Sequence, residues 1–373
     1  MSITKLGMPK WGLNMREGAL VAWLAEEGAE LEVGDEVAEV ETEKINGVVE
    51  SPAAGTLRRR VAAVGDVVPV GGLLGVLADA SVGDEEIDAY VAEFQATFVP
   101  EAEEDEAGPA AETATVDGRP IRYARRGEGA VAVVLVHGFG GDLTTWLFNQ
   151  DALAAEERSV IAPDLPGHGG SSKEVADGGL DELAGSVQGL LDELGVERVH
   201  LVGHSLGAAV AATIAGRTPD RAASLTLVAP AGLGPEINGE FLEGFVEAES
   251  RRELKPVLET LFSDPAVVTR EFVEEVLRTK RIDGVGEALR TISSSCFPEG
   301  RQAISIRDGL AALDVPILVI WGAEDRVVPA AQADALPAGA QVEIVAGAGH
   351  MPQMEAAHEV NRLLGDFLEA HGA

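Results

Sequence analysis

The stretch of chain around residue 205 constrains the fold more than any other. An apolar run, VHLV at 199–202, leads into the pentapeptide GHSLG at 203–207, and the alanine-rich run AAVAA follows. An apolar run, a G-x-S-x-G turn and a helix-forming run together predict a strand, a sharp turn and a helix. Gly203 and Gly207 suit such a turn because neighbouring backbones come too close there for a side chain. The pattern predicts that Ser205 lies at a helix N-terminus, which favours negative charge, and acts as a nucleophile.

Residues 114–373 alternate between strand-like and helix-like runs. This alternation predicts an α/β fold, a mostly parallel sheet with helices on both faces, which an antiparallel hairpin at 113–124 opens. A long insertion with helical runs lies between the predicted strands, at 233–311. The predicted strands of the sheet core are 131–136, 159–162, 199–202, 224–228, 317–321 and 342–345.

Five motifs in this segment resemble those of the α/β-hydrolase superfamily. They are HGFGG at 137–141, DLPGHG at 164–169, GHSLG at 203–207, WGAED at 321–325 and GHMP at 349–352. The resemblance spans the whole segment, and the chain order serine, acid, histidine is the one that this fold uses. The resemblance also implies that the insertion at 233–311 is a cap, which is expected to shape an acyl pocket and exclude water.

The chemistry of a serine nucleophile then assigns roles. A serine hydroxyl needs a base, and His350, after the last predicted strand, is the candidate. Asp325, after the preceding strand, would fix the imidazole tautomer and stabilise its cation. The backbone N–H groups of Phe139 and Leu206 are expected to form an oxyanion hole. Other polar residues of these motifs are expected to support the backbone or to lie outside the site: His137, Asp164, His168, His204, Glu324 and His358.

Residues 1–79 consist of short valine-rich runs with Gly, Asp and Pro between them, which predict small β-strands. The octapeptide VGDEVAEV at 33–40 returns as VGDVVPVG at 64–71. Two copies of such a unit predict an all-β flattened barrel of two similar halves rather than a solenoid.

The hairpin between the two copies carries ETEK at 41–44, with Lys44 at its predicted apex. Together with MPK at 8–10 and Gly55, this pattern resembles a lipoyl domain. The resemblance implies that Lys44 carries a lipoyl group as an amide. Biotin carriers share the fold but usually place Met on both sides of the lysine, whereas the neighbours here are Glu43 and Ile45, so lipoate is favoured. The arginine run 58–60 is interpreted as a solvated strand edge rather than a docking patch.

Residues 80–113 have the composition of a tether. No Lys or Arg occurs between Arg60 and Arg119, and residues 100–109 read PEAEEDEAGP. Such a self-repelling linker spans roughly 30–35 Å, enough for a swinging carrier to reach another site. Within it, Ser81 would cap a short helix with one apolar face. That helix is expected to pack on one of the chain's own domains rather than to dock partner subunits.

Composition excludes several functional classes. A net charge of −35 argues against nucleic acid or an anionic membrane as a partner. The single cysteine, Cys296, cannot form an internal disulfide and is expected to be a filler residue in a reducing compartment. No run is long enough to span a membrane and no signal sequence is recognisable, so a cytoplasmic protein is expected. No metal site is predicted.

A lipoyl carrier tethered to an α/β-hydrolase domain resembles the acyltransferase (E2) subunits of acetoin dehydrogenase complexes. This resemblance implies that a thiamine-dependent E1 loads an acetyl group onto lipoyl-Lys44, that coenzyme A accepts it, and that a flavin-dependent E3 reoxidises the arm. Ser205 is expected to carry the acetyl group between the two thiols, and a homo-oligomer is expected. The H-x-x-x-D-G motif of the usual E2 transferase domain is absent, so the trimer-based core of those subunits is not implied.

Two other functions remain open at this stage. The first is a hydrolase of an ester, thioester or C–C bond with an appended lipoyl carrier, which would release acetate. The second is a non-enzymatic carrier and scaffold, in which replacing Ser205 would change nothing. The complete set of serine, acid and histidine in the expected order disfavours the scaffold.

Overall fold

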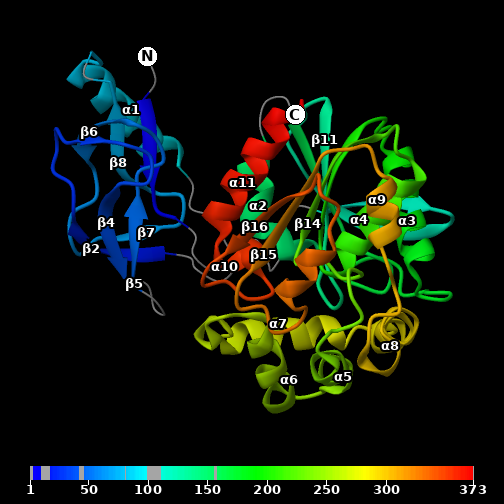
Figure 1. Cartoon of the computed structure of the whole chain (residues 1–373). Helices are drawn as coiled ribbons and strands as arrows, with labels where there is room; N and C mark the ends of the chain where they lie inside the picture. The colour runs from blue at the N-terminus through cyan, green and yellow to red at the C-terminus, as the bar shows by residue number, and fades with distance from the viewer. Residues whose placement is uncertain are drawn as a thin grey trace. The chain divides into compact units, whose positions relative to one another are not determined.

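The computed structural model describes residues 3–9, 17–41, 46–79, 81–98, 111–154 and 158–372. The chain divides into two compact units, Met1–Ala107 and Gly108–Ala373, each with its own hydrophobic core (Figure 1). Among the described residues, no helix is long and apolar enough to cross a membrane.

The first unit contains two four-stranded antiparallel sheets, as the valine-rich runs predict. Their strand orders are β1-β8-β6-β3 and β5-β4-β2-β7. Apolar side chains that include Leu20, Val37 and Leu57 form their common core. The strands are β1 Ile3–Gly7, β2 Glu17–Trp23, β3 Glu30–Leu31, β4 Glu36–Glu41, β5 Asn46–Glu50, β6 Gly55–Arg60, β7 Val67–Pro69 and β8 Leu73–Ala78.

The sequence repeat builds the same turn twice. Asp35 accepts a hydrogen bond from the Glu32 backbone N–H at 2.8 Å, and Asp66 accepts one from Ala63 at 2.8 Å. The glycine between the partners has a left-handed backbone in both copies, with φ of 91° at Gly34 and 95° at Gly65. Each turn leads into a strand of the same sheet, β4 or β7. The two copies in the sequence are therefore equivalent structural units.

The helix expected after the barrel is α1, Asp84–Thr97, and it packs on β8 of the first unit with Ile87 fully buried. The prediction that Ser81 caps the N-terminus of this helix is wrong. The residue before the helix is Gly83, and the Ser81 hydroxyl donates instead to Asp79 at 2.6 Å, because a side-chain acceptor two residues away competes with the helix end.

The interpretation of the arginine run as a solvated edge is also wrong. Strand β6 lies between β8 and β3, inside its sheet. Arg58 pairs with Asp84 at 2.8 Å and Arg59 with Asp88 at 2.7 Å, so two of these arginines bind α1 to the barrel.

The second unit has one eight-stranded sheet of order β16-β15-β14-β13-β11-β12-β10-β9. Strands β11 to β16 are parallel, whereas β9 and β10 form the expected antiparallel hairpin. Helices α3 and α4 cover one face, and α2 and α11 cover the other (Figure 1). The bounds are β9 Ala111–Val116, β10 Arg119–Arg126, β11 Val131–Val136, β12 Arg158–Pro163, β13 Val199–His204, β14 Ala222–Val228, β15 Ile317–Gly322, β16 Gln341–Val345, α2 Leu147–Leu153, α3 Leu180–Glu193, α4 Leu206–Arg217, α10 Pro352–Glu355 and α11 Ala357–Ala370.

Four helices between β14 and β15, which we call the cap, lie together at one end of the sheet (Figure 1). They are α5 Gly239–Glu247, α6 Arg251–Leu258, α7 Arg270–Lys280 and α8 Val285–Cys296. The next helix, α9 Arg307–Ala312, packs against α4 and so belongs to the layer on the sheet. The 3₁₀ helices are η1 Leu143–Trp146, η2 Glu259–Leu261, η3 Pro265–Val267, η4 Pro298–Gly300 and η5 Ala330–Ala335.

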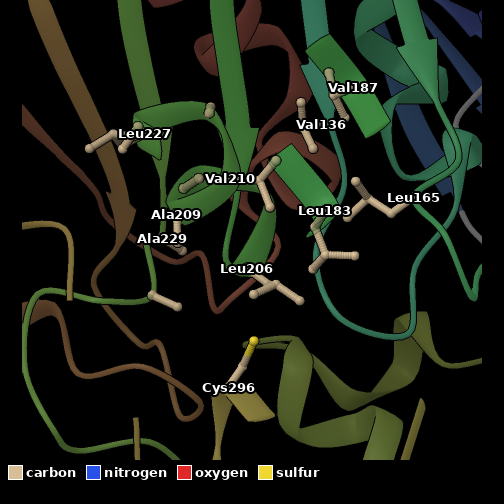
Figure 2. Packing of buried hydrophobic residues seen from close by; sticks show 14 of the residues in the cluster. Val136, Leu165, Leu183, Val187, Leu206, Ala209, Val210, Leu227, Ala229 and Cys296 are labelled. Atoms are coloured by element: carbon tan, nitrogen blue, oxygen red, sulfur yellow. The ribbon is translucent and has the colours of Figure 1, made fainter. Parts of the chain in front are cut away.

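The cap and the sheet share one hydrophobic core. Figure 2 shows Leu206 and Leu183 beneath the strands, with Cys296 reaching toward them from the cap. Cys296 is fully buried, its thiol donates to the Gly178 carbonyl at 3.3 Å, and burial raises its pKa to about 12. The cysteine is a core residue, as expected of a filler.

Candidate active site

The turn between β13 and α4 has the geometry that the glycines predict. Ser205 has φ 53° and ψ −116°, a backbone conformation that a non-glycine residue adopts only under constraint. A Cβ on Gly203 would lie 2.2 Å from the Gly207 carbonyl oxygen, and one on Gly207 would lie 2.3 Å from the carbonyl oxygens of Val136 and His137. Close backbone contact on both sides therefore fixes the strand, turn and helix that present Ser205.

His350 and Asp325 meet on the loops after β16 and β15. His350 Nδ1 lies 2.8 Å from Asp325 Oδ2, and their side chains are 2% and 0% exposed. Burial alone would raise the pKa of Asp325. The adjacent His350 and the backbone N–H groups of Val327 and Val328 outweigh that effect and hold the pKa below its ordinary value. The ionised carboxylate places a proton on His350 Nδ1 and leaves Nε2 free to act as a base.

Ser205 is linked to His350 through its neighbour His204. His204 Nε2 donates to the His350 carbonyl oxygen at 2.9 Å, and the two rings lie 4.8 Å apart. Burial lowers the pKa of His204 to about 3, so this histidine is neutral and supports the backbone. No hydrogen bond joins the Ser205 hydroxyl to His350 within the described part of the chain, a spacing that is common before substrate binds.

The loop after β11 lies directly against Ser205. A Cβ on Gly138 would lie 3.0 Å from the Ser205 Cβ. The backbone N–H groups of Phe139 and Leu206 have no hydrogen-bond acceptor among the described residues. Two free N–H groups beside a serine are what an oxyanion hole requires.

Three other polar side chains of the motifs hold the backbone around the HGFGG loop in place. His137 Nε2 accepts from the Leu165 N–H at 2.9 Å, and His168 Nε2 accepts from the Gly140 N–H at 3.1 Å. Asp164 accepts from two backbone N–H groups at 2.7 Å. These three side chains hold backbone, as expected, and leave Ser205, His350 and Asp325 as the candidate reactive residues.

Comparison with known proteins shows which family the chain belongs to. A family model described as alpha/beta hydrolase fold matches residues 131–357, and one described as biotin-requiring enzyme matches residues 4–77. The chain is 50% identical over 363 residues to the dihydrolipoyllysine-residue acetyltransferase component of the acetoin cleaving system of Cupriavidus necator, which covers 97% of this chain and 96% of that protein. The chain belongs to this acetyltransferase-component family.

A second member of the family, from Pseudomonas putida, is 50% identical over 371 residues and covers 99% of each chain. Among solved structures, the meta-cleavage product hydrolase CumD from Pseudomonas fluorescens IP01 matches with a TM-score of 0.64 and 26% identity. That match covers 69% of this chain and 97% of the hydrolase, so the similarity is to the second unit of this family member.

The predicted lipoyl position, Lys44, lies outside the described residues. The flanking strands β4 and β5 pair as an antiparallel hairpin, with Glu41 opposite Asn46. The match of the first unit to a biotin and lipoyl family and the names of the full-length relatives support a covalently attached lipoyl carrier.

Sequence reasoning missed the part of the site that the cap contributes. The Phe139 ring contacts Phe245 of α5 at 6.0 Å and Phe297, after α8, at 6.1 Å between ring centroids. Nothing in the spacing of these phenylalanines along the chain indicated that they meet the HGFGG loop. They place apolar side chains of the cap against the HGFGG loop, and Ser205 is 6% exposed.

Proposed function

We propose that this family member transfers an acetyl group from lipoyl-Lys44 to coenzyme A through an acetyl-Ser205 intermediate. The lipoyl group supplies a thiol that carries the acetyl group as a thioester. The identity to acetoin-cleaving acetyltransferase components over nearly the whole chain supports the overall reaction. The buried His350–Asp325 pair and the constrained backbone of the turn at Ser205 support the route through Ser205.

Residues of the chain itself take up and return the proton in each step. In the first, His350 Nε2 takes the Ser205 proton as the Oγ–C bond forms, and gives that proton to the departing lipoyl sulfur as the C–S bond breaks. In the second, His350 takes the proton of the coenzyme A thiol as the new C–S bond forms, and gives that proton to Ser205 Oγ as the Oγ–C bond breaks. The N–H groups of Phe139 and Leu206 would stabilise the oxyanion in both steps.

The closed site favours transfer over hydrolysis. Ser205 and His350 are 6% and 2% exposed beneath the cap. A thiol is a better nucleophile than water, and a dry site limits competition from water. The alternative, a hydrolase with an appended carrier, is supported by the similarity of the second unit to CumD.

As a component of an acetoin cleaving system, this chain would act with an E1 and an E3 enzyme. We further propose that the E1 is thiamine-dependent, that the E3 is flavin-dependent, and that the chain forms a homo-oligomer. The names of the full-length relatives support the presence of other components.

The test offers the full-length protein acetyl-dihydrolipoamide with and without coenzyme A, and quantifies acetyl-CoA and acetate. Formation of acetyl-CoA that disappears in Ser205→Ala is the expected result. Acetate alone, abolished by the same substitution, would replace the transferase with the hydrolase. Acetyl-CoA formation that survives Ser205→Ala would refute the route through the serine.

A further inference from the structure

A half-buried lysine of the cap places its ammonium group at the last turn of a neighbouring cap helix. Lys280 is the final residue of α7, and its ammonium donates to the carbonyl oxygens of Phe245, of Val246 at 3.3 Å and of Ala248 at 2.8 Å. These carbonyls belong to the C-terminal end of α5, where helix carbonyls lack partners within the helix. A cation at a helix C-terminus also complements the helix dipole. Lys280 therefore fixes the end of a helix that is not its own.

Phe245, near that helix end, contacts the HGFGG loop at residues 137–141. The Lys280 ammonium lies 5.0 Å from the centroid of the Phe245 ring, and Phe245 is 3% exposed. Carbon atoms of the ring lie 2.3 and 2.5 Å from where a Cβ on Gly140 would be, so the ring packs directly on the Gly140 backbone. Gly140 has φ 73°, a left-handed conformation in a position that has no room for a side chain.

The turn at Phe139 and Gly140 is thus held from two sides. His168 accepts the Gly140 N–H at 3.1 Å from the side of the sheet, and Phe245 covers the same residue from the cap. The Phe139 ring contacts both, at 6.3 Å from His168 and 6.0 Å from Phe245. A cap helix therefore contacts Gly140, the residue that directly follows the Phe139 N–H proposed for the oxyanion hole.

We propose that Lys280 is a positioning residue, which holds Phe245 on Gly140 and so keeps the Phe139 N–H aimed into the oxyanion hole. This inference rests on the proposed acyl transfer at Ser205. The cap then has a part in the chemical step as well as in covering the site. Loss of the ammonium would leave three carbonyl groups without their donor and would loosen the end of α5.

The test compares Lys280→Met with Arg278→Met in the full-length protein. Arg278 is a cation on the same helix that pairs with Glu275, so its variant is the matched control. Steady-state kinetics of acetyl-CoA formation and the rate of Ser205 labelling by a fluorophosphonate are measured on both. Losing one oxyanion donor costs about 10²–10³-fold in kcat, so a misaimed donor is expected to cost roughly 10–100-fold.

We expect Lys280→Met to lower kcat and the labelling rate together while KM changes less than about threefold, and Lys280→Arg to restore part of both. If circular dichroism shows that Lys280→Met does not fold, the kcat and labelling rate of Phe245→Leu test the inference instead. That variant removes the ring and keeps an apolar side chain. Wild-type kcat and labelling in the variant, or an equal loss in Arg278→Met, would overturn the inference.

The labelling arm separates this inference from the proposed function. If the wild-type protein forms no acetyl-CoA yet its labelling slows in Lys280→Met, acetyl transfer is refuted and the positioning role stands. If acetyl-CoA forms at the wild-type rate in the variant, transfer stands and the positioning role is refuted.

Discussion

Replacing Asp325 by Asn tests the proton arrangement on which the proposed chemistry depends. Asp325 Oδ1 accepts from the backbone N–H groups of Val327 at 2.8 Å and Val328 at 3.0 Å, whereas Oδ2 accepts from His350 Nδ1 at 2.8 Å and Trp321 Nε1 at 2.9 Å. An asparagine offers one oxygen and one amino group. The backbone N–H groups of Val327 and Val328 have fixed directions, so we expect the asparagine oxygen to keep accepting from them. The amino group would then face His350.

The amino group would then donate to His350 Nδ1, and the imidazole proton would move to Nε2. Trp321 retains a second acceptor, the Val328 carbonyl oxygen at 3.2 Å, so its N–H does not oppose this orientation. With Nε2 protonated, no lone pair is left to take the Ser205 proton. A histidine held in the wrong tautomer costs about 10⁴-fold in kcat, which is about 5 kcal/mol of barrier.

The assay is acetyl-CoA formation from acetyl-dihydrolipoamide near neutral pH, with Glu324→Gln as the matched control because Glu324 is the exposed neighbouring carboxylate. We expect Asp325→Asn to keep the fold, to lose about four orders of magnitude in kcat and to leave KM almost unchanged. A variant that retains more than about a tenth of wild-type kcat would refute the assigned tautomer, because a tautomer error of this kind leaves no working base.

Three further predictions concern stability. Gly207→Ala should lower the free energy of unfolding by more than about 3 kcal/mol, because the new Cβ would meet rigid backbone oxygens at 2.3 Å. Gly216→Ala in the same helix has open space around the new Cβ and should raise the free energy of unfolding by about 0.5–1 kcal/mol. Urea unfolding measures both variants, and similar midpoints would refute the contact argument. Burial lowers the pKa of His168 and of His204 to about 3, so as the pH falls these histidines take up protons in the unfolded chain before they do so in the folded protein. The free energy of unfolding should therefore fall below pH 6.5, by about 2 kcal/mol for each histidine at pH 5. Equal urea midpoints at pH 7 and pH 5 would contradict this. Arg58→Gln should speed hydrogen exchange of the α1 amides, because the arginine donates to two loop carbonyls as well as to Asp84; unchanged exchange there would show that apolar packing alone holds the helix.

The features that the sequence predicted well are those that local chemistry determines. The glycines at 203 and 207 predicted the turn at Ser205 because the close approach they permit lies within one strand–turn–helix unit. The repeat in the first unit predicted equivalent turns because an Asp acceptor three residues after its N–H donor acts locally. The chain order of serine, acid and histidine placed His350 and Asp325 on adjacent loops, where the structure brings them to 2.8 Å.

The features that the sequence did not predict depend on contacts between distant segments. The side chain of Arg58 was interpreted as solvated, but it reaches acceptors more than twenty residues away. Lys280 lies in no motif, and only the packing of α7 against its neighbours brings its ammonium group to the carbonyl oxygens at the end of α5. Likewise, Phe245 and Phe297 carry no motif, and only the fold of the cap brings them to Phe139.

The most direct test of the central claim is to trap the acyl-enzyme. The full-length protein is mixed with acetyl-dihydrolipoamide without coenzyme A, quenched in acid, digested and examined by mass spectrometry. The account predicts one acetyl group on the peptide that contains Ser205, which disappears with formation of acetyl-CoA when coenzyme A is added. Acetyl-CoA formation at full rate with no acetyl group ever detected on Ser205 would contradict it.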